Sequence, residues 1–148
     1  MKVVEVTSEN RDLIKKIYEN EIESFGVMGG ADMWMIMSFI RYGKLYVLLK
    51  DDELLAVAQF QKIMKENGVF LYGFSTVEKH RNKGYAKYLL KETEKRLKEI
   101  NIESIYLTVD PNNEIAVNMY KKLGYKILEF QEDEYGEGIH RYLMYKRL

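Results

Sequence analysis

A strand–loop–helix segment in the middle of the chain has the composition of an anion-binding site. Residues 74–86 read FSTVEKHRNKGYA, so a basic loop joins an apolar strand to the start of a helix. Free backbone N–H groups at a helix start, with the helix dipole behind them, attract anions. Gly84 would let a phosphate approach the backbone closely, and Arg81 and Lys83 add positive charge. The residues alone allow two interpretations, a phosphate site or a solvated helix start with surface lysines.

A second segment, residues 107–125, places two polar side chains on another helix. Asn113 is positioned to cap the helix, and Tyr120 lies two turns further on, on its apolar side. A tyrosine on an apolar stripe is ordinarily a core aromatic residue. From this segment alone, the core interpretation of Tyr120 is favoured over a catalytic one.

Taken together, the two segments resemble the GCN5-related N-acetyltransferase (GNAT) superfamily. The first matches the pyrophosphate signature of that superfamily as Arg81-x-x-Gly84-x-Ala86. The second matches its Asn-x-x-Ala-x-x-x-Tyr-x-x-x-Gly-Phe/Tyr pattern at five positions: Asn113, Ala116, Tyr120, Gly124 and Tyr125. The order of the segments, their separation and the flanking strands agree too, so the resemblance covers nearly the whole chain.

The resemblance implies acetyl-CoA as a co-substrate and no metal. It implies that strand backbone at Phe74, Ser75 and Thr76 faces the pantetheine arm. It also implies that the following loop wraps the pyrophosphate through its backbone amides, with these residues: Arg81, Asn82, Lys83, Gly84, Tyr85, Ala86 and Lys87. Asn113 would lie beside the cofactor in addition to capping its helix.

The resemblance reverses the interpretation of Tyr120. It implies that the Tyr120 hydroxyl points at the coenzyme sulfur and protonates the departing thiolate. A primary amine would then attack the thioester directly, without a covalent enzyme intermediate, and the chain has no cysteine to form one. The acceptor ammonium, with a pKa near ~10, must first lose a proton.

The sequence does not identify the group that takes this proton. Ribosomal-protein N-terminal acetyltransferases carry a glutamate where this chain has Thr108. The resemblance implies that residues 24–35 and 133–140 form the acceptor side. His140, Asp32 and Glu23 are candidates, because they lie in or next to these segments. Each of the three is also explained as a surface or structural residue. The acceptor would be the amine of a small molecule, an amino acid or a peptide.

A second hypothesis is a non-catalytic module that binds acyl-CoA and regulates a partner protein. The presence of Tyr120 favours the enzyme, whereas Thr108 in place of glutamate favours the binding module. The choice of acyl group and the oligomeric state, monomer or homodimer, stay open.

The elements around these segments predict an α/β chain with one domain, residues 1–148. Apolar periodicity predicts a mixed sheet of about six or seven strands with helices on both faces. Strands are expected at residues 2–6, 45–49, 54–64, 69–76, 104–109, 125–130 and 139–146. Strand 104–109 should run parallel to strand 69–76, by the crossover rule. These two strands should part where the helix starts of both motifs converge.

Composition excludes several classes of function. The formal net charge of the 148 residues is zero, which argues against a general nucleic-acid binder. The absence of cysteine excludes disulfides, thiolate metal sites and a cysteine nucleophile, and two histidines are too few for a typical histidine metal cluster. No secretory signal and no membrane span is visible, so we expect a cytoplasmic protein that binds no membrane.

Overall fold

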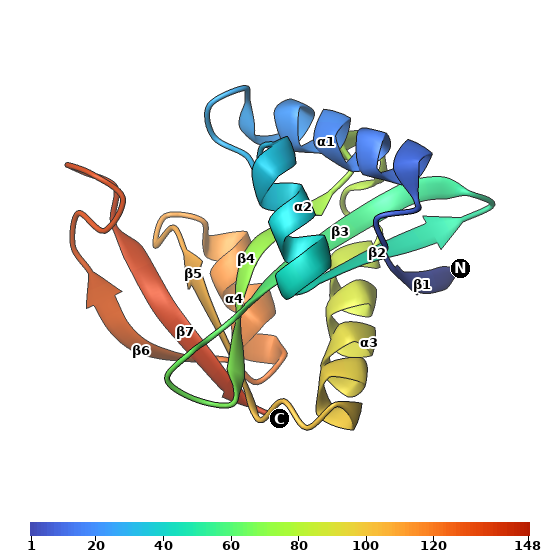
Figure 1. Ribbon diagram of the computed structural model, residues 1–148. Helices are drawn as coiled ribbons and strands as arrows, with labels where there is room; N and C mark the ends of the chain where they lie inside the picture. The colour runs from blue at the N-terminus through green and yellow to red at the C-terminus, as the bar shows by residue number, and fades with distance from the viewer.

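The computed structural model describes all 148 residues and contains seven strands in one sheet together with four α-helices (Figure 1). The strands are β1 (Lys2–Glu5), β2 (Lys44–Lys50), β3 (Glu53–Lys62), β4 (Gly68–Thr76), β5 (Ser104–Val109), β6 (Lys126–Gln131) and β7 (Arg141–Arg147). The helices are α1 (Arg11–Phe25), α2 (Met33–Tyr42), α3 (Tyr85–Glu99) and α4 (Glu114–Lys122), with a short 3₁₀ turn, η1 (Glu78–His80), before α3. The strand order is β1-β2-β3-β4-β5-β7-β6, and only the β4–β5 pair is parallel.

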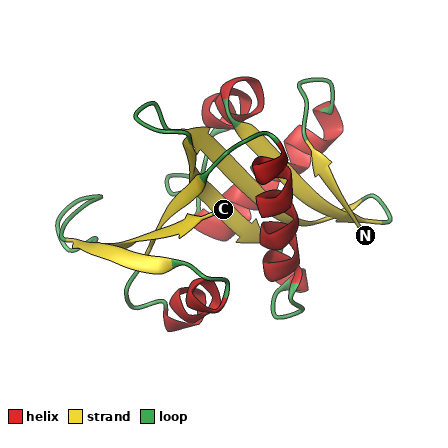
Figure 2. Cartoon of the chain, turned by 90° about the horizontal axis from the view of Figure 1, so that it is seen from below, coloured by secondary structure: helices red, strands yellow, loops and turns green.

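Two hydrophobic layers lie on opposite faces of the sheet, and Figure 2 shows helices on both sides of it. Successive side chains of a strand point to opposite faces. In β2, Val47 therefore packs in the layer beneath α1 and α2, whereas Tyr46 and Leu48 pack in the layer with α3 and α4. Burial on both faces explains why β2 and β3 are nearly continuous apolar runs. The predicted fold class is confirmed.

The parallel strands β4 and β5 part after only a short ladder. Their last pair is Leu71 with Leu107, although β4 continues to Thr76. At the same point β4 carries a bulge, because Tyr72 has no partner in β3. A bulge bends the strand that carries it and increases its local twist. The predicted parting of these strands is therefore confirmed, and the bulge supplies its physical cause.

Thr7 and Ser8 are of the residue types that cap helices, so the sequence predicts that the first helix starts after one of them, and the structure differs. The helix begins at Arg11 after Asn10, rather than directly after a cap at Thr7 or Ser8. Residues 7–10 instead form a turn, in which Asn10 N donates to Thr7 O (3.1 Å) and Asn10 Oδ1 accepts from Thr7 N (2.8 Å). The short polar side chains therefore stabilise the turn before the helix.

Asn67-Gly68 is of the type that predicts a two-residue hairpin turn between the strands expected at 54–64 and 69–76. The hairpin between β3 and β4 is present, but Asn67-Gly68 is not its turn. The connection covers residues 63–67, and neither Asn67 nor Gly68 has a positive φ. Gly68 is already paired with Ser104, whose hydroxyl occupies the space where a Cβ would lie. The glycine is required by the close approach of β5 and not by turn geometry.

Apolar residues at helical spacing also predict that Ile100 and Ile115 lie on buried helix faces, but both are exposed. Ile115 is 83% exposed and Ile100 is 50% exposed. The buried positions of α4 and its C-terminal cap are instead Val117, Tyr120 and Leu123, at the spacing of successive helical turns. None of the helices is both long enough and apolar enough to cross a membrane.

Candidate functional site

Two clefts open beside β4 and meet at one place. The hairpin cleft, of about 660 Å³, lies between the α1–α2 loop, β4, β5 and the β6–β7 loop. The loop cleft, of about 520 Å³, lies between the end of β4, residues 80–87 and α4. The same residues line both clefts at their junction: Phe25, Phe74, Asn113, Ala116 and Tyr120. Two ligands, one in each cleft, would meet at this junction.

The anion loop, residues 81–87, presents a row of free backbone N–H groups. The amides of residues 82–87 donate to no other backbone group, and the first such bond at this helix start runs from Tyr88 N to Gly84 O (3.0 Å). Gly84 has a φ of +79°, and a Cβ there would meet nothing within 4 Å. These free donors lie at the N-terminus of α3, whose dipole favours negative charge. The residues present therefore fit a pyrophosphate.

Nearly all residues predicted to bind the cofactor line the loop cleft: Phe74, Ser75, Thr76, Arg81, Asn82, Gly84, Tyr85, Ala86, Lys87 and Asn113. Lys83 does not, and its ammonium group donates to Lys79 O (3.2 Å). Residues 74–76 pair with β3 on one side and with no strand on the other. Thr76 O accepts a long hydrogen bond from Arg81 Nε (3.4 Å). The edge that pairs with no strand suits an extended amide-bearing chain such as pantetheine.

Tyr120 has a buried ring and a hydroxyl without a protein partner. Its exposed fraction is 7%, and its ring packs against those of Phe74 (6.4 Å between centroids) and Tyr125 (5.7 Å). Burial is the cause that raises the pKa of the Tyr120 hydroxyl above its usual range, with no contribution from a hydrogen bond. The hydroxyl therefore stays protonated and can donate to a group at the junction of the clefts.

Asn113 fixes the start of α4 beside Tyr120. Its Oδ1 accepts from Ala116 N (3.2 Å), as the sequence predicts for an N-cap. The cap sets the orientation of the helix that carries Tyr120, and Asn113 itself lines both clefts.

Glu21 is a buried carboxylate in the wall of the hairpin cleft, and the sequence analysis missed it. It is 2% exposed and accepts from Ala31 N (2.9 Å) and Gln59 Nε2 (2.8 Å). Burial raises the pKa of the Glu21 carboxyl, and the two hydrogen bonds oppose that rise. A signal was present, because Glu21 follows Ile14 and Ile17 at helical spacing on the buried side of α1.

The three predicted candidates for the proton acceptor line neither cleft. Asp32 caps α2 by accepting from Met35 N (2.9 Å), and Glu23 is exposed on α1. His140 Nδ1 accepts from Asp133 N (3.0 Å) inside the β6–β7 loop. The carboxylates that do line the hairpin cleft are Glu21 and Asp110.

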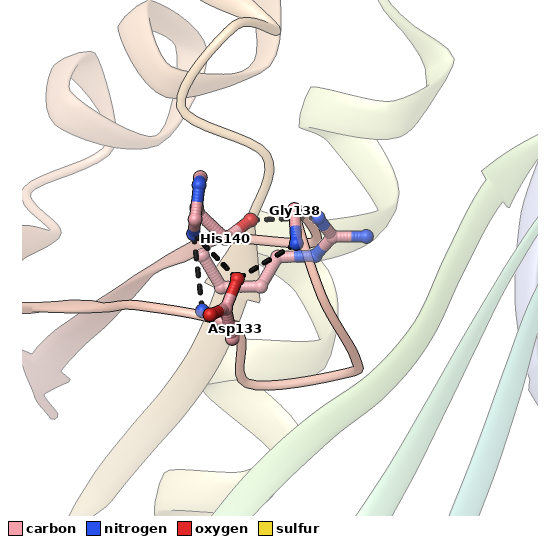
Figure 3. A network of polar contacts seen from close by, with 4 residues as sticks. Asp133, Gly138 and His140 are labelled. Atoms are coloured by element: carbon pink, nitrogen blue, oxygen red, sulfur yellow. Dashed lines mark hydrogen bonds and ion pairs between the residues drawn. The ribbon is translucent and has the colours of Figure 1, made fainter.

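The β6–β7 loop is held by its own hydrogen bonds, which Figure 3 shows around Asp133, Gly138 and His140. Asp133 Oδ1 accepts from Gly138 N (2.7 Å), so the loop folds back on itself. The loop also reaches β5, because the hydroxyls of Tyr135 and Thr108 lie 3.1 Å apart in a hydrogen bond. Thr108 thus anchors the loop that closes the hairpin cleft.

Comparisons with known proteins show which family and fold this chain resembles. A family model described as "Acetyltransferase (GNAT) family" matches residues 14–125. A curated N-alpha-acetyltransferase of Sulfurisphaera tokodaii is 38% identical over 71 residues, which are 47% of this chain and 42% of that protein. The chain matches less than half the length of each of its curated relatives.

Solved structures share the fold along nearly the whole chain. An aminoglycoside 6'-N-acetyltransferase complexed with coenzyme A has a TM-score of 0.84 at 17% identity, covering 99% of this chain and 97% of that one. The ribosomal-protein-S18-alanine N-acetyltransferase from Escherichia coli has a TM-score of 0.82 at 15% identity, covering 99% and 92%. At these identities the likeness concerns the fold.

The raised pKa of Glu21 makes a testable contribution to stability. The folded protein binds the Glu21 proton more tightly than the unfolded chain does. This contribution is therefore present below the unfolded pKa of 4.5 and is lost as the pH rises through the folded pKa. In Glu21→Gln, a flipped Gln59 amide can still pair, because Gln59 Oε1 has no partner.

We expect the free energy of unfolding of Glu21→Gln to rise relative to the parent between pH 4.5 and 8, by about 1.4 kcal/mol for each unit of pKa elevation. Urea unfolding across this pH range measures the difference. Glu23→Gln, an exposed neighbour on the same helix, should show a flat difference. If the difference in unfolding free energy between Glu21→Gln and the parent also stays constant across this pH range, the raised pKa of Glu21 is contradicted.

Proposed function

Because the chain belongs to the acetyltransferase (GNAT) family, we propose that it transfers the acetyl group of acetyl-CoA to the primary amine of a small molecule, an amino acid or a peptide. The observation that carries this proposal is the junction of the two clefts at Asn113 and Tyr120. Acetyl-CoA supplies an activated acyl group as its thioester. The protein contributes binding, orientation and two proton-handling groups.

The anion loop and the free edge of β4 hold the cofactor in this proposal. Backbone amides of residues 82–87 bind the pyrophosphate, and Arg81 and Lys87 add charge at the same cleft. Phe74, Ser75 and Thr76 pair with the pantetheine amides. The thioester end then reaches the junction, where the acceptor amine arrives through the hairpin cleft.

Tyr120 acts as the general acid in this proposal. Its hydroxyl lacks a protein partner and lines both clefts, so it is free to donate to the sulfur of the departing thiolate. General acid catalysis of this kind contributes about 10²–10⁴-fold to the rate.

Glu21 takes the proton of the acceptor ammonium, directly or through water. It lines the cleft through which the amine arrives, and its burial makes it a stronger base than an exposed carboxylate. Asp110 is the alternative carboxylate of this cleft, and it accepts from Asn112 N (2.9 Å) at the end of β5.

Replacement of Gly84 tests cofactor binding. Gly84→Glu adds a side chain and a negative charge at the anion loop, so we expect acetyl-CoA affinity to fall by more than about tenfold. Titration calorimetry measures it. Gly138→Glu is a matched control, because Gly138 has a similar φ of +76° and open space around it, but lies in neither cleft. Equal binding by Gly84→Glu and the parent would exclude the anion loop as the pyrophosphate site.

Removal of the Tyr120 hydroxyl tests its role as general acid. We expect Tyr120→Phe to lose about 10²–10⁴-fold in turnover while acetyl-CoA affinity and thermal stability stay nearly unchanged, since the ring still packs. Thiol release with a panel of amines measures turnover. Tyr125→Phe is the control. The Tyr125 hydroxyl donates to Glu94 (3.0 Å), so this variant should lose thermal stability rather than turnover. Parental turnover by Tyr120→Phe would mean that the proton comes from elsewhere.

The pH–rate profile tests Glu21 as the proton acceptor. With Glu21 ionised, the enzyme accepts the abundant ammonium form, so the rate should be level from neutral pH up to the pKa of the amine, which is near ~10 for a simple aliphatic amine and near ~8 for a peptide α-amine. Glu21→Gln should depend on free amine, and log(kcat/KM) should rise by about one for each pH unit in that range. Glu23→Gln should keep the parental profile. The same change of slope in Asp110→Asn, but not in Glu21→Gln, would assign the role to Asp110.

A further inference from the structure

Arg141, the first residue of β7, lines the hairpin cleft without a carboxylate partner. It is half-buried, and it forms none of the ion pairs of the protein. One guanidinium nitrogen donates to His140 O (2.7 Å). Because guanidinium carries five N–H donors, most of them are left for solvent or a ligand in the cleft.

The orientation of the Arg141 guanidinium is fixed from one side. Its carbon atom lies 5.4 Å from the centroid of the Tyr135 ring, within the range of a cation–π contact. The hydroxyl of Tyr135 is in turn hydrogen-bonded to Thr108 on β5. Both residues also line the hairpin cleft. Loop and strand thus hold the arginine in place before any ligand binds, which lowers the entropic cost of using it.

No carboxylate of the protein forms an ion pair with Arg141. The β6–β7 loop carries Glu132, Asp133, Glu134 and Glu137, and all four are exposed. Asp133 is already hydrogen-bonded to Gly138 N within the loop. In the cleft itself, Glu21 is bonded to Ala31 and Gln59. The remaining cleft carboxylate, Asp110, follows the last β5–β7 pair and makes no ion pair with Arg141.

We propose that Arg141 binds a carboxylate of the acceptor, so that preferred acceptors are amines that also carry a carboxylate. A carboxylate matches the planar fork of guanidinium in a bidentate pair. The inference rests on the proposed function, since it concerns the acceptor of the same reaction. The carboxylate belongs either to a free amino acid or to an acidic side chain near the amino end of a peptide.

Matched acceptors test this proposal. For free amino acids the pair is leucine and leucinamide, and for peptides it is one short sequence with glutamate or glutamine at the second position. The ratio of kcat/KM within each pair is measured by thiol release in the parent and in Arg141→Gln. We expect at least one ratio in the parent to favour the carboxylate, and Arg141→Gln to lower that ratio by about tenfold to a hundredfold. The pair that responds identifies the source of the carboxylate.

Ratios separate ligand binding from a structural role of Arg141. A merely loosened β6–β7 loop would slow both members of a pair equally, whereas a lost carboxylate contact slows only one. Arg141→Lys should restore part of the preference, because it keeps the charge without the fork. Arg147→Gln, at the exposed far end of β7, should keep the parental ratios.

Two outcomes would overturn the proposal. Unchanged ratios for both pairs in Arg141→Gln would overturn the role of Arg141 while leaving acetyl transfer intact. No thiol release by the parent with any amine, despite binding of acetyl-CoA in calorimetry, would overturn the proposed function and this inference together.

Discussion

The separation of β4 from β5 is the constraint on which the rest of the site depends. A parallel ladder needs two backbones at a constant spacing. The bulge at Tyr72 bends β4, so its pairing with β5 stops directly after Leu71. Beyond it, β4 keeps its hydrogen bonds to β3 but has a free edge on the other side. Buried backbone groups rarely stay unpaired, so this edge is suited to a ligand with amide groups of its own. Both clefts open along it.

The N-termini of α3 and α4 lie at the gap between β4 and β5. The N-terminus of α3 carries the free amides of the anion loop, and the N-terminus of α4 is capped by Asn113 at the junction of the clefts. In the proposed reaction, burial of Tyr120 makes full proton transfer less favourable, because the pKa of a thiol is near ~8.5 and that of this phenol is raised above its usual range. A hydrogen bond to the developing thiolate is then its main contribution, and a proton from solvent can follow.

Apolar periodicity and the family resemblance predicted the sheet and the parting of its strands, and local sequence predicted the starts of α3 and α4, whereas the burial of single side chains by tertiary packing was not predicted. The cap at Asn113 and the glycine at position 84 follow from what a helix start requires, so sequence motifs locate them well. Glu21 was missed because a charged residue on a helix is ordinarily solvated. Only the approach of Gln59 on β3 and of Ala31 on the next loop makes its burial possible. Ile115 was assigned to the core for the opposite reason, since nothing local says that it borders an open cleft.

One turn of α1 connects the two clefts. Asn20 Nδ2 donates to Ser75 Oγ (2.8 Å), on the part of β4 that borders the loop cleft. The next residue, Glu21, holds Gln59 and the α1–α2 loop at Ala31, which borders the hairpin cleft. Buried polar pairs add little net stability compared with apolar packing, but they are strongly directional. Apolar contacts of Ile14 and Ile17 hold α1 against the sheet without fixing the direction of a hydrogen bond. These two adjacent polar residues select one position of the helix, and that position sets both walls relative to the junction at Tyr120.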